Sequence, residues 1–249
     1  MPPDSPPPAP STGIAPMPVE PAPVTSVDQG VLEDANSGRS WLSPTALTDP
    51  KGTWSFSDYE LLAVGVGYSP TDHLSLSATT LLPLTEDFPL LLFLNAKLQV
   101  VKSGNLRVAL QGAILHFRES SGSTTVSATA GDVGAVATLC LDIECHSHLS
   151  GFLAAGFAYE EQAAVPFLVA ASLAYRVGKH VKLILEVDSG FIAGDGVTVG
   201  ADGFLLFYGV RFTSRNIGVD LALAKPICEG CNDGLVLGIP FVAFTYRSI

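Results

Sequence analysis

The sequence predicts an all-β fold: a transmembrane antiparallel β-barrel of twelve strands that follows a disordered, proline-rich tail. Of the 249 residues, 47% are hydrophobic and only 15% are charged, which is apolar for a soluble chain of this length. Yet the sequence contains no run of about 18 apolar residues that would form a spanning helix. The apolar residues alternate instead with glycine, alanine, serine and threonine over short segments, which is typical of strands that cross a membrane.

The N-terminal region differs from the rest of the chain. Its first 30 residues are dominated by proline, alanine, serine and valine and show no periodicity. Such a composition favours a disordered or polyproline-like segment over a packed core. We therefore expect a periplasmic tail over residues 1–35 and a barrel domain over residues 36–249.

The barrel domain divides into segments of the length that a tilted strand needs to cross a bilayer. The segment 39–47 fits this pattern least, because it contains Pro44, and strands admit proline mainly at ends and bulges. The twelve predicted strands cover residues 39–47, 53–68, 74–82, 90–101, 106–117, 128–141, 149–159, 165–177, 181–191, 204–213, 216–224 and 235–247.

The alternation within these segments also predicts which face meets lipid. If the outward face is chosen from hydrophobic residues alone, the charged residues of the strands fall on the opposite face. A charge that faces lipid near the bilayer centre costs about 2–4 kcal/mol, so the apolar face should point outward. The alternative is a soluble sandwich or lipocalin-like barrel, but its second face should be rich in lysine and glutamate. The charges on the inward face are Lys97, Arg107, Asp132, Arg176, Lys182, Glu186, Asp188, Arg211, Asp220 and Arg247.

The connections between segments alternate in length. Mostly short ones, such as residues 102–105 and 177–180, alternate with mostly longer ones, such as residues 192–203 and 224–234. Outer-membrane barrels have short periplasmic turns and longer external loops. We therefore place the short connections, and with them both termini of the barrel, in the periplasm.

Residues 36–52 contain three short motifs, an Asn-x-x-Arg-x-aromatic stretch, a Ser-Pro-Thr-Ala step and a Lys-Gly pair. They are carried by Asn36, Arg39 and Trp41, by residues 43–46, and by Lys51 with Gly52. This opening resembles that of a group of uncharacterised Gram-negative outer-membrane β-barrel proteins. The resemblance implies a barrel in the bacterial outer membrane and carries over no catalytic residue. The chain departs from the usual outer-membrane ending, because Ile249 stands where phenylalanine or tryptophan is common.

The inward charges predict what the lumen does. The basic residues lie toward the periplasmic half and would form a ring that attracts anions, with acidic residues nearer mid-wall. This favours a passive channel for small hydrophilic solutes. One alternative is an internal salt-bridge network that ties the strands together. Another is a structural or interaction barrel with an occluded lumen, which would anchor a periplasmic or surface partner through its tail or loops.

The four cysteines predict two local disulfides, Cys140 with Cys145 and Cys228 with Cys231, in an oxidising compartment. The alternative for the first pair is a metal site formed with His146 and His148. We expect no metal or other cofactor at either pair.

Other chemistry is sparse in the sequence, and we expect no enzymatic activity. His116 precedes serines at 120, 121 and 123, but no acidic or amide residue is placed to orient its imidazole. The loop from Asp195 to Asp202 is too poor in carboxylates for an EF-hand. A formal net charge of -11 argues against nucleic acid as a partner. The expected partners are outer-membrane lipid, a small solute, and a periplasmic protein bound through the tail.

Overall fold

The computed structural model describes residues 34–82, 89–121, 124–158, 165–194, 197–199, 203–228 and 237–248. Of the predicted tail, residues 1–33 lie outside these residues and stay a prediction, whereas Asp34 and Ala35 are described and buried. The strands are β1 (Trp54–Tyr59), β2 (Ala63–Thr71), β3 (Leu74–Leu81), β4 (Leu90–Ser103), β5 (Leu106–Ser121), β6 (Thr124–Cys140), β7 (His148–Ala158), β8 (Val165–Gly178), β9 (Val181–Gly194), β10 (Val197–Val199), β11 (Gly203–Thr213), β12 (Ile217–Cys228) and β13 (Ile239–Ser248).

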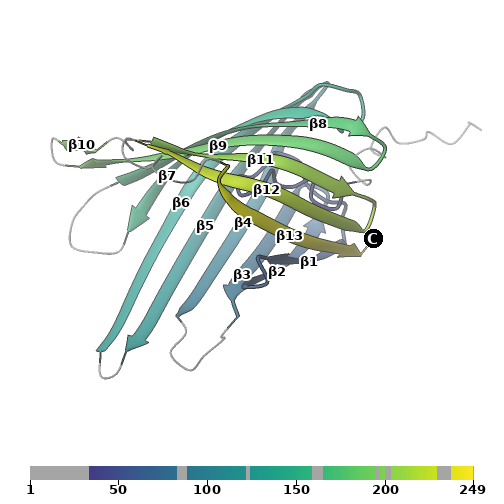
Figure 1. Ribbon diagram of the computed structural model, residues 1–249. Helices are drawn as coiled ribbons and strands as arrows, with labels where there is room; N and C mark the ends of the chain where they lie inside the picture. Colours follow the sequence, from purple (N-terminus) through teal and green to yellow (C-terminus); the bar gives the residue numbers. More distant parts are fainter. Residues whose placement is uncertain are drawn as a thin grey trace, which may run out of the picture.

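Twelve of these strands form a closed antiparallel barrel (Figure 1). Each strand of the wall pairs with its neighbour in the chain, apart from β10, and β1 pairs with β13 to close the ring. The short strand β10 pairs only with the end of β9, so β11 takes the next place in the wall. The closed ring confirms the barrel prediction. Closure leaves no unpaired strand edge in contact with lipid, as a membrane-spanning sheet requires.

Two of the predicted strands are wrong, although the number twelve is correct. The segment 39–47 is not a wall strand, and the predicted strand 53–68 is two strands, β1 and β2, joined by a turn at residues 60–62. Glu60 and Leu61 adopt positive φ angles of 58° and 59° in this turn. The turn was missed because Leu61 and Leu62 continue the apolar run of the strands, where turns usually contain glycine, asparagine or aspartate.

Side chains alternate between the two faces of the wall as the sequence predicts. Large apolar residues such as Leu94 and Leu185 point outward and are 43% and 45% exposed. Their neighbours Asn95 and Glu186 point into the barrel. The exterior is therefore an apolar surface suited to lipid, and the polar groups face the lumen.

The wall is much lower on one side than on the other. β1 has six residues and β3 has eight, whereas β5 and β6 have 16 and 17 and extend well beyond them (Figure 1). No helix among the described residues is both long and apolar enough to cross a membrane.

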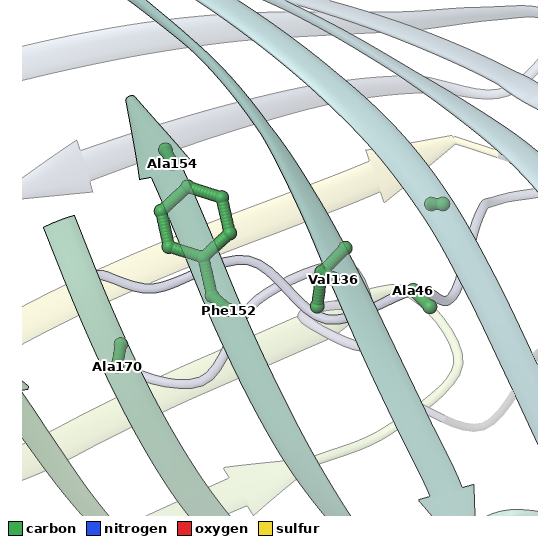
Figure 2. Close-up of a cluster of buried hydrophobic side chains, with 6 residues drawn as sticks. Ala46, Val136, Phe152, Ala154 and Ala170 are labelled. Carbon is green, nitrogen blue, oxygen red and sulfur yellow. The ribbon is translucent and has the colours of Figure 1, made fainter. Parts of the chain in front are cut away.

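Residues 34–49 fold inside the barrel, and we call this segment the plug. Figure 2 shows its chain running between strands on the two sides of the barrel. Its residues Trp41, Thr45 and Ala46 have no exposed surface. The segment 39–47 belongs to the plug because its serines, threonines and proline suit turns better than a strand.

We predict that Leu94→Arg destabilises the barrel, by about 2–4 kcal/mol, because it places a charge in lipid. Asn95→Arg is the matched control, with the same charge one residue away but facing the lumen. Leu185→Arg should behave like Leu94→Arg. Urea unfolding in lipid vesicles measures the free energies of unfolding, and equal losses for Leu94→Arg and Asn95→Arg would contradict the assignment of faces.

Candidate functional site: the plugged lumen

The plug is a compact series of turns held by its own backbone. The amide of Asn36 donates to Asp34 Oδ1 at 2.9 Å, and the amide of Thr45 donates to the carbonyl of Gly38 at 3.1 Å. Residues Arg39 and Pro44 form an isolated antiparallel bridge across the second turn. Several plug carbonyls remain without backbone partners, so the wall has to satisfy them.

Arg211 of β11 supplies most of these partners. Its Nε and Nη2 donate to both oxygens of Asp220 on β12, at 2.7 and 3.1 Å. Its Nη1 donates to the carbonyls of Asn36 and Arg39, each at 3.0 Å, and its Nη2 also donates to the carbonyl of Ser40. One fully buried guanidinium thus joins two wall strands to three plug carbonyls.

Asp34 forms the second attachment, at the periplasmic end of the plug. Lys182 donates to its carboxylate at 2.5 Å and Thr213 at 3.1 Å. Burial alone would raise the pKa of Asp34, but the charges of Lys182 and Arg211 outweigh burial and hold the pKa well below its usual range. This attachment is therefore complete at neutral pH and is lost only in strong acid.

Arg247 of β13 binds the two ends of the plug together. It donates to the carbonyl of Asp34 at 3.0 Å and to Asp49 Oδ1 at 2.6 Å. It also donates to the carbonyl of Arg215 in the periplasmic turn that follows β11. The plug therefore starts at the periplasmic mouth, and the chain enters the barrel from that side.

The opposite wall binds the second turn of the plug. Lys97 of β4 donates to the carbonyls of Gly38 and Thr45, at 2.8 and 2.9 Å, and Gln99 donates to the carbonyl of Ala46 at 2.7 Å. Thr138 of β6 accepts the amide of Ala46 at 2.8 Å. Both sides of the plug are thus hydrogen-bonded to the wall.

The acidic residues of β9 bind amides where the basic residues bind carbonyls. Glu186 accepts three consecutive plug amides, those of Trp41, Leu42 and Ser43, at 2.6, 3.0 and 3.0 Å. Asp188 accepts the hydroxyl of Ser43. A carboxylate that accepts several backbone N–H groups can be buried without a basic partner.

Apolar contacts complete the attachment. Trp41 packs with Ala174, Ile184 and Phe207 of the wall. Ala46 lies in a second buried cluster with five wall residues, among them Val136, Phe152 and Ala154 (Figure 2).

Glycine is required where β12 passes closest to the plug. A Cβ atom added to Gly218 would lie 2.9 Å from Nδ2 of Asn36, which is closer than real Cβ contacts come. Asn36 Nδ2 donates to Asp220 at 3.1 Å, so it has little freedom to move.

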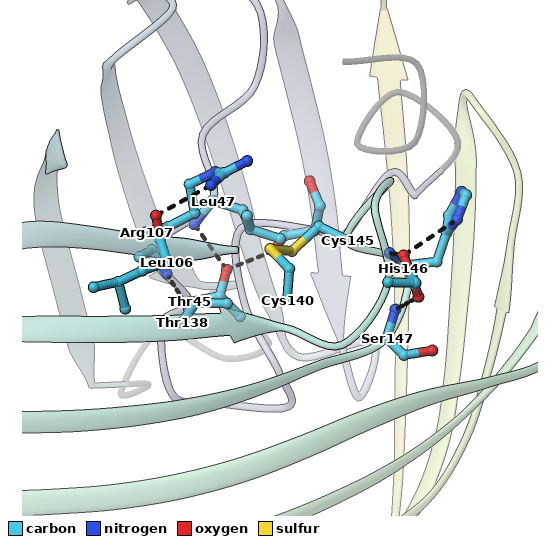
Figure 3. The surroundings of a disulfide bond; sticks show 12 residues. Thr45, Leu47, Leu106, Arg107, Thr138, Cys140, Cys145, His146 and Ser147 are labelled. Atoms are coloured by element: carbon cyan, nitrogen blue, oxygen red, sulfur yellow. Dashed lines mark hydrogen bonds and ion pairs between the residues drawn. A yellow bond between two sulfur atoms is a disulfide. The ribbon is translucent and has the colours of Figure 1, made fainter. Parts of the chain in front are cut away.

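Seven of the ten predicted lumen charges meet at the plug, and Arg107, Arg176 and Asp132 do not. Lys97, Lys182, Glu186, Asp188, Arg211, Asp220 and Arg247 all contact the plug or a residue that binds it. Both Arg107, which is labelled in Figure 3, and Arg176 bind carbonyls of their own periplasmic turns, at distances as short as 2.6 Å. The basic residues of the expected ring are therefore already hydrogen-bonded, because plug and turn groups accept from their N–H groups.

The remaining candidate residues stand apart from the plug. Asp132 occupies an inward position on β6, and its Oδ1 has no hydrogen-bond partner. His116 bonds to Thr129 on the neighbouring strand, at 3.0 Å. The side chains of the serines at 120, 121 and 123 lie outside the described residues, as do Asp195 and Asp202 at the ends of the loop whose middle forms β10.

A polar crevice separates the plug from the low side of the wall. It has a volume of about 220 Å³. Its lining extends from Thr53 and Ser69, near the periplasmic turns, to Tyr59 and Thr79, near the external ends of β1 and β3. The other wall residues that line it are mainly small or hydroxylated, including Ser55, Ser57, Gly65, Gly67, Ser75, Ser77 and Asn95.

One predicted disulfide is present and lies against the plug. Cys140 and Cys145 are bonded, and both are buried with Leu47 of the plug (Figure 3). The alternative metal site is not formed, since its two thiols are consumed and the described residues contain no cluster suited to a metal. Cys228 carries no free thiol, but its predicted partner Cys231 lies outside the described residues.

Asp142 holds the turn that this disulfide closes. Its two carboxylate oxygens accept the amides of His146 and Ser147, at 2.8 and 2.7 Å. Burial opposes ionisation, but these hydrogen bonds outweigh it and lower the pKa of Asp142 below its usual value.

Several functional residues escaped the sequence reasoning. Asp34, Gln99, Thr138 and Thr213 all bind across the plug interface, yet none stands out in the sequence. The poor fit of residues 39–47 to a strand was the signal that the segment does something else.

No protein-family model matches the chain, and no curated protein matches it. Among solved structures, it is similar to an OmpT from Vibrio cholerae lacking loop L8, with a TM-score of 0.42, 15% identity, and coverage of 75% of this chain and 62% of that chain. It is also similar to LpxR from Salmonella typhimurium, with a TM-score of 0.44, 10% identity, and coverage of 79% of this chain and 99% of that chain. A third similar structure is OprD from Pseudomonas aeruginosa, with a TM-score of 0.38, 13% identity, and coverage of 77% of this chain and 59% of that chain. The chain thus spans less than two thirds of the OmpT and OprD structures.

This comparison corrects one expectation. We expected from the sequence that the chain is not an enzyme, but LpxR is an outer-membrane barrel enzyme, so this architecture does not argue against catalysis. The predicted location is confirmed: a closed barrel of twelve strands with an apolar exterior is a bacterial outer-membrane protein.

We predict that Arg211→Leu releases the plug. The change leaves Asp220 buried without its main partner and frees three plug carbonyls, and breaking a buried ion pair costs about 3–5 kcal/mol. Proteolysis between residues 34 and 49 in folded, vesicle-embedded protein measures the release. Arg107→Leu is the matched control and should leave the plug protected, because Arg107 binds only turn carbonyls. Full protection in Arg211→Leu would show that the apolar contacts suffice.

We predict that replacing Cys140 and Cys145 together by serine lowers the free energy of unfolding by about 2 kcal/mol, the value expected for so short a closed loop. Urea unfolding in vesicles, with and without a reductant, tests this. Reductant should reduce the stability of the wild type and leave the double variant nearly unchanged. An equal effect of reductant on both proteins would contradict the prediction.

Proposed function

We propose that the protein is a narrow passive channel for small polar solutes, whose path is the crevice between the plug and strands β1–β4. The observation that supports this most is the lining of the crevice, which runs over the whole height of the short strands. The side chains along this path are mostly hydroxyls, and they offer hydrogen bonds in place of those a solute makes with water.

The size of the crevice limits what can pass. Its volume of about 220 Å³ equals that of roughly seven water molecules at liquid density. Water, ions and small neutral solutes fit such a space, whereas a solute the size of a disaccharide would require the plug to move.

The charges beside the crevice suggest weak ion selectivity. Lys97 donates to plug carbonyls, and Asp49 is paired with Arg247 at 2.6 Å. Arg39 donates to the carbonyl of Trp41 and lies over the ring of Tyr59 at 4.8 Å. Because each charge is already engaged, we expect less discrimination between anions and cations than a free basic ring would impose.

A second candidate function is a sealed barrel that anchors the N-terminal region. The plug has buried ion pairs and enters from the periplasmic side, so residues 1–33 precede a firmly held segment. In this case the proline-rich sequence would bind a periplasmic partner, and the lumen would carry no current.

Conductance of the purified protein in planar bilayers tests the channel. Wild-type protein should give small, steady currents, and Ser77→Trp should reduce them several-fold because the indole fills the crevice. Leu92→Trp is the matched control, with the same side chain on the lipid face of β4 and outside the lining of the crevice, and should conduct like the wild type. Well-folded wild-type protein that is silent over a wide voltage range would reject the channel and favour the anchoring function.

A further inference from the structure

The lumen changes character above the plug, toward the external loops. We call this upper part the outer lumen. On β4 and β5 its inward positions hold Leu91, Phe93, Leu115 and Phe117, as the strand register shows. Across the barrel they hold Leu168, Leu205, Phe207 and Phe241.

Phe207 belongs to a buried cluster against which Leu205 and Phe241 pack, but the other apolar residues of the outer lumen lie outside the buried clusters. Leu168 points inward yet is 41% exposed, and Phe93, Leu115, Phe117, Leu205 and Phe241 are only partly buried. Phe207 and Phe241 meet edge to face at 5.8 Å and form part of the floor, over Trp41 of the plug. A channel for polar solutes has a polar interior, so an apolar and accessible outer lumen is unexpected for transport alone.

The charges of the outer lumen are of one sign. The charged side chains at inward positions of the described strands above the plug are all carboxylates, and no lysine or arginine is among them. Glu186 and Asp188 bind plug groups, but Oδ1 of Asp132 accepts no hydrogen bond. Asp132 stands opposite Ala113 and Gly156, whose side chains are small, and its side chain is only partly buried although its Oδ1 is covered.

The external connections extend the same charge. Residues 60–62, 82–89, 122–123, 159–164, 195–202 and 229–238 contain no lysine or arginine. Their acids are Glu60, Glu86, Asp87, Glu160, Glu161, Asp195, Asp202, Glu229 and Asp233. Arg118 and Lys225 stand near the external ends of β5 and β12, but at outward-facing positions of the wall. An excess of one charge sign at the mouth raises the local concentration of the opposite ion. Anionic amphiphiles, such as free fatty acids, are disfavoured by the same field.

We propose that the outer lumen is a binding site for an amphipathic cation, a small molecule with an apolar chain and a protonated amine. The chain would lie on Phe93, Leu115 and Phe117, and the ammonium group would pair with Asp132, the carboxylate without a partner at their base. The aromatic faces attract the cation as it enters. This inference does not depend on the proposed channel, because binding requires no conduction through the crevice.

A photoreactive alkylamine with a diazirine in its C11 chain tests the site in full-length protein in phosphatidylcholine vesicles. After irradiation, fragmentation mass spectrometry locates the label. We expect label on the inward residues of β4–β6, such as Phe93 and Leu115, and its loss when dodecylamine competes. Dodecanoate and dodecanol should compete at least about tenfold less well.

Two variants separate the amine from the chain. Asp132→Asn keeps the shape of the site and should weaken labelling about tenfold. Its control, Glu144→Gln, removes an acid from a periplasmic turn and should label like the wild type. Leu168→Lys, which places a cation in the outer lumen, should also abolish labelling. If that variant fails to fold, the three competitors and Asp132→Asn still decide the question.

Three results would overturn the proposal. The first is label confined to the lipid-facing residues, such as Leu94 and Ile114. The second is equal competition by the three C12 compounds, and the third is undiminished labelling of Asp132→Asn. None of these results bears on the conductance of the crevice, so the two proposals fail separately.

Discussion

Arg211 and its partners explain why this barrel has a plug. Arginine stays charged at any physiological pH, and a buried charge without partners costs far more than folding can supply. Asp220 neutralises the charge, but a guanidinium has five N–H groups, and Asp220 accepts only two of them. The carbonyls of the plug accept others. The wall and the plug therefore satisfy each other's hydrogen bonds: buried side-chain donors of the wall bind backbone carbonyls of the plug.

The hydrogen bonds between wall donors and plug carbonyls also divide the lumen into unequal parts. The basic residues that bind the plug stand on β4, β9, β11 and β13, whereas most inward positions of β1–β3 that face the crevice hold serine, threonine or glycine, with Tyr59 as an exception. Small hydroxylated side chains cannot reach across to the plug, so a crevice remains beside these short strands. The low side of the wall and the polar path therefore coincide.

The two halves of the barrel also differ in polarity. In the periplasmic half, inward charges are matched by backbone groups of the plug, so little charge is left to act on a solute. In the outer half, no described plug residue covers the inward side chains of β4, β5, β8 and β11, which include leucine, phenylalanine and, on neighbouring strands, carboxylates. One barrel thus combines a filled polar part with an accessible apolar part.

The sequence by itself determined the architecture of the wall. Because strand side chains alternate strictly, the choice of an apolar outward face for Leu94 or Leu185 placed Lys97 and Arg211 in the lumen without any structural information. Only the tertiary structure decided what those charges do. The partners of Arg211 and Lys97 are mostly plug carbonyls, and every residue has a carbonyl, so no residue type marks them in the sequence. The turn at residues 60–62 and the fate of residues 39–47 were likewise settled by three-dimensional contacts. Both segments have local patterns compatible with strands, and competition for the buried donors of the wall assigns residues 39–47 to the lumen.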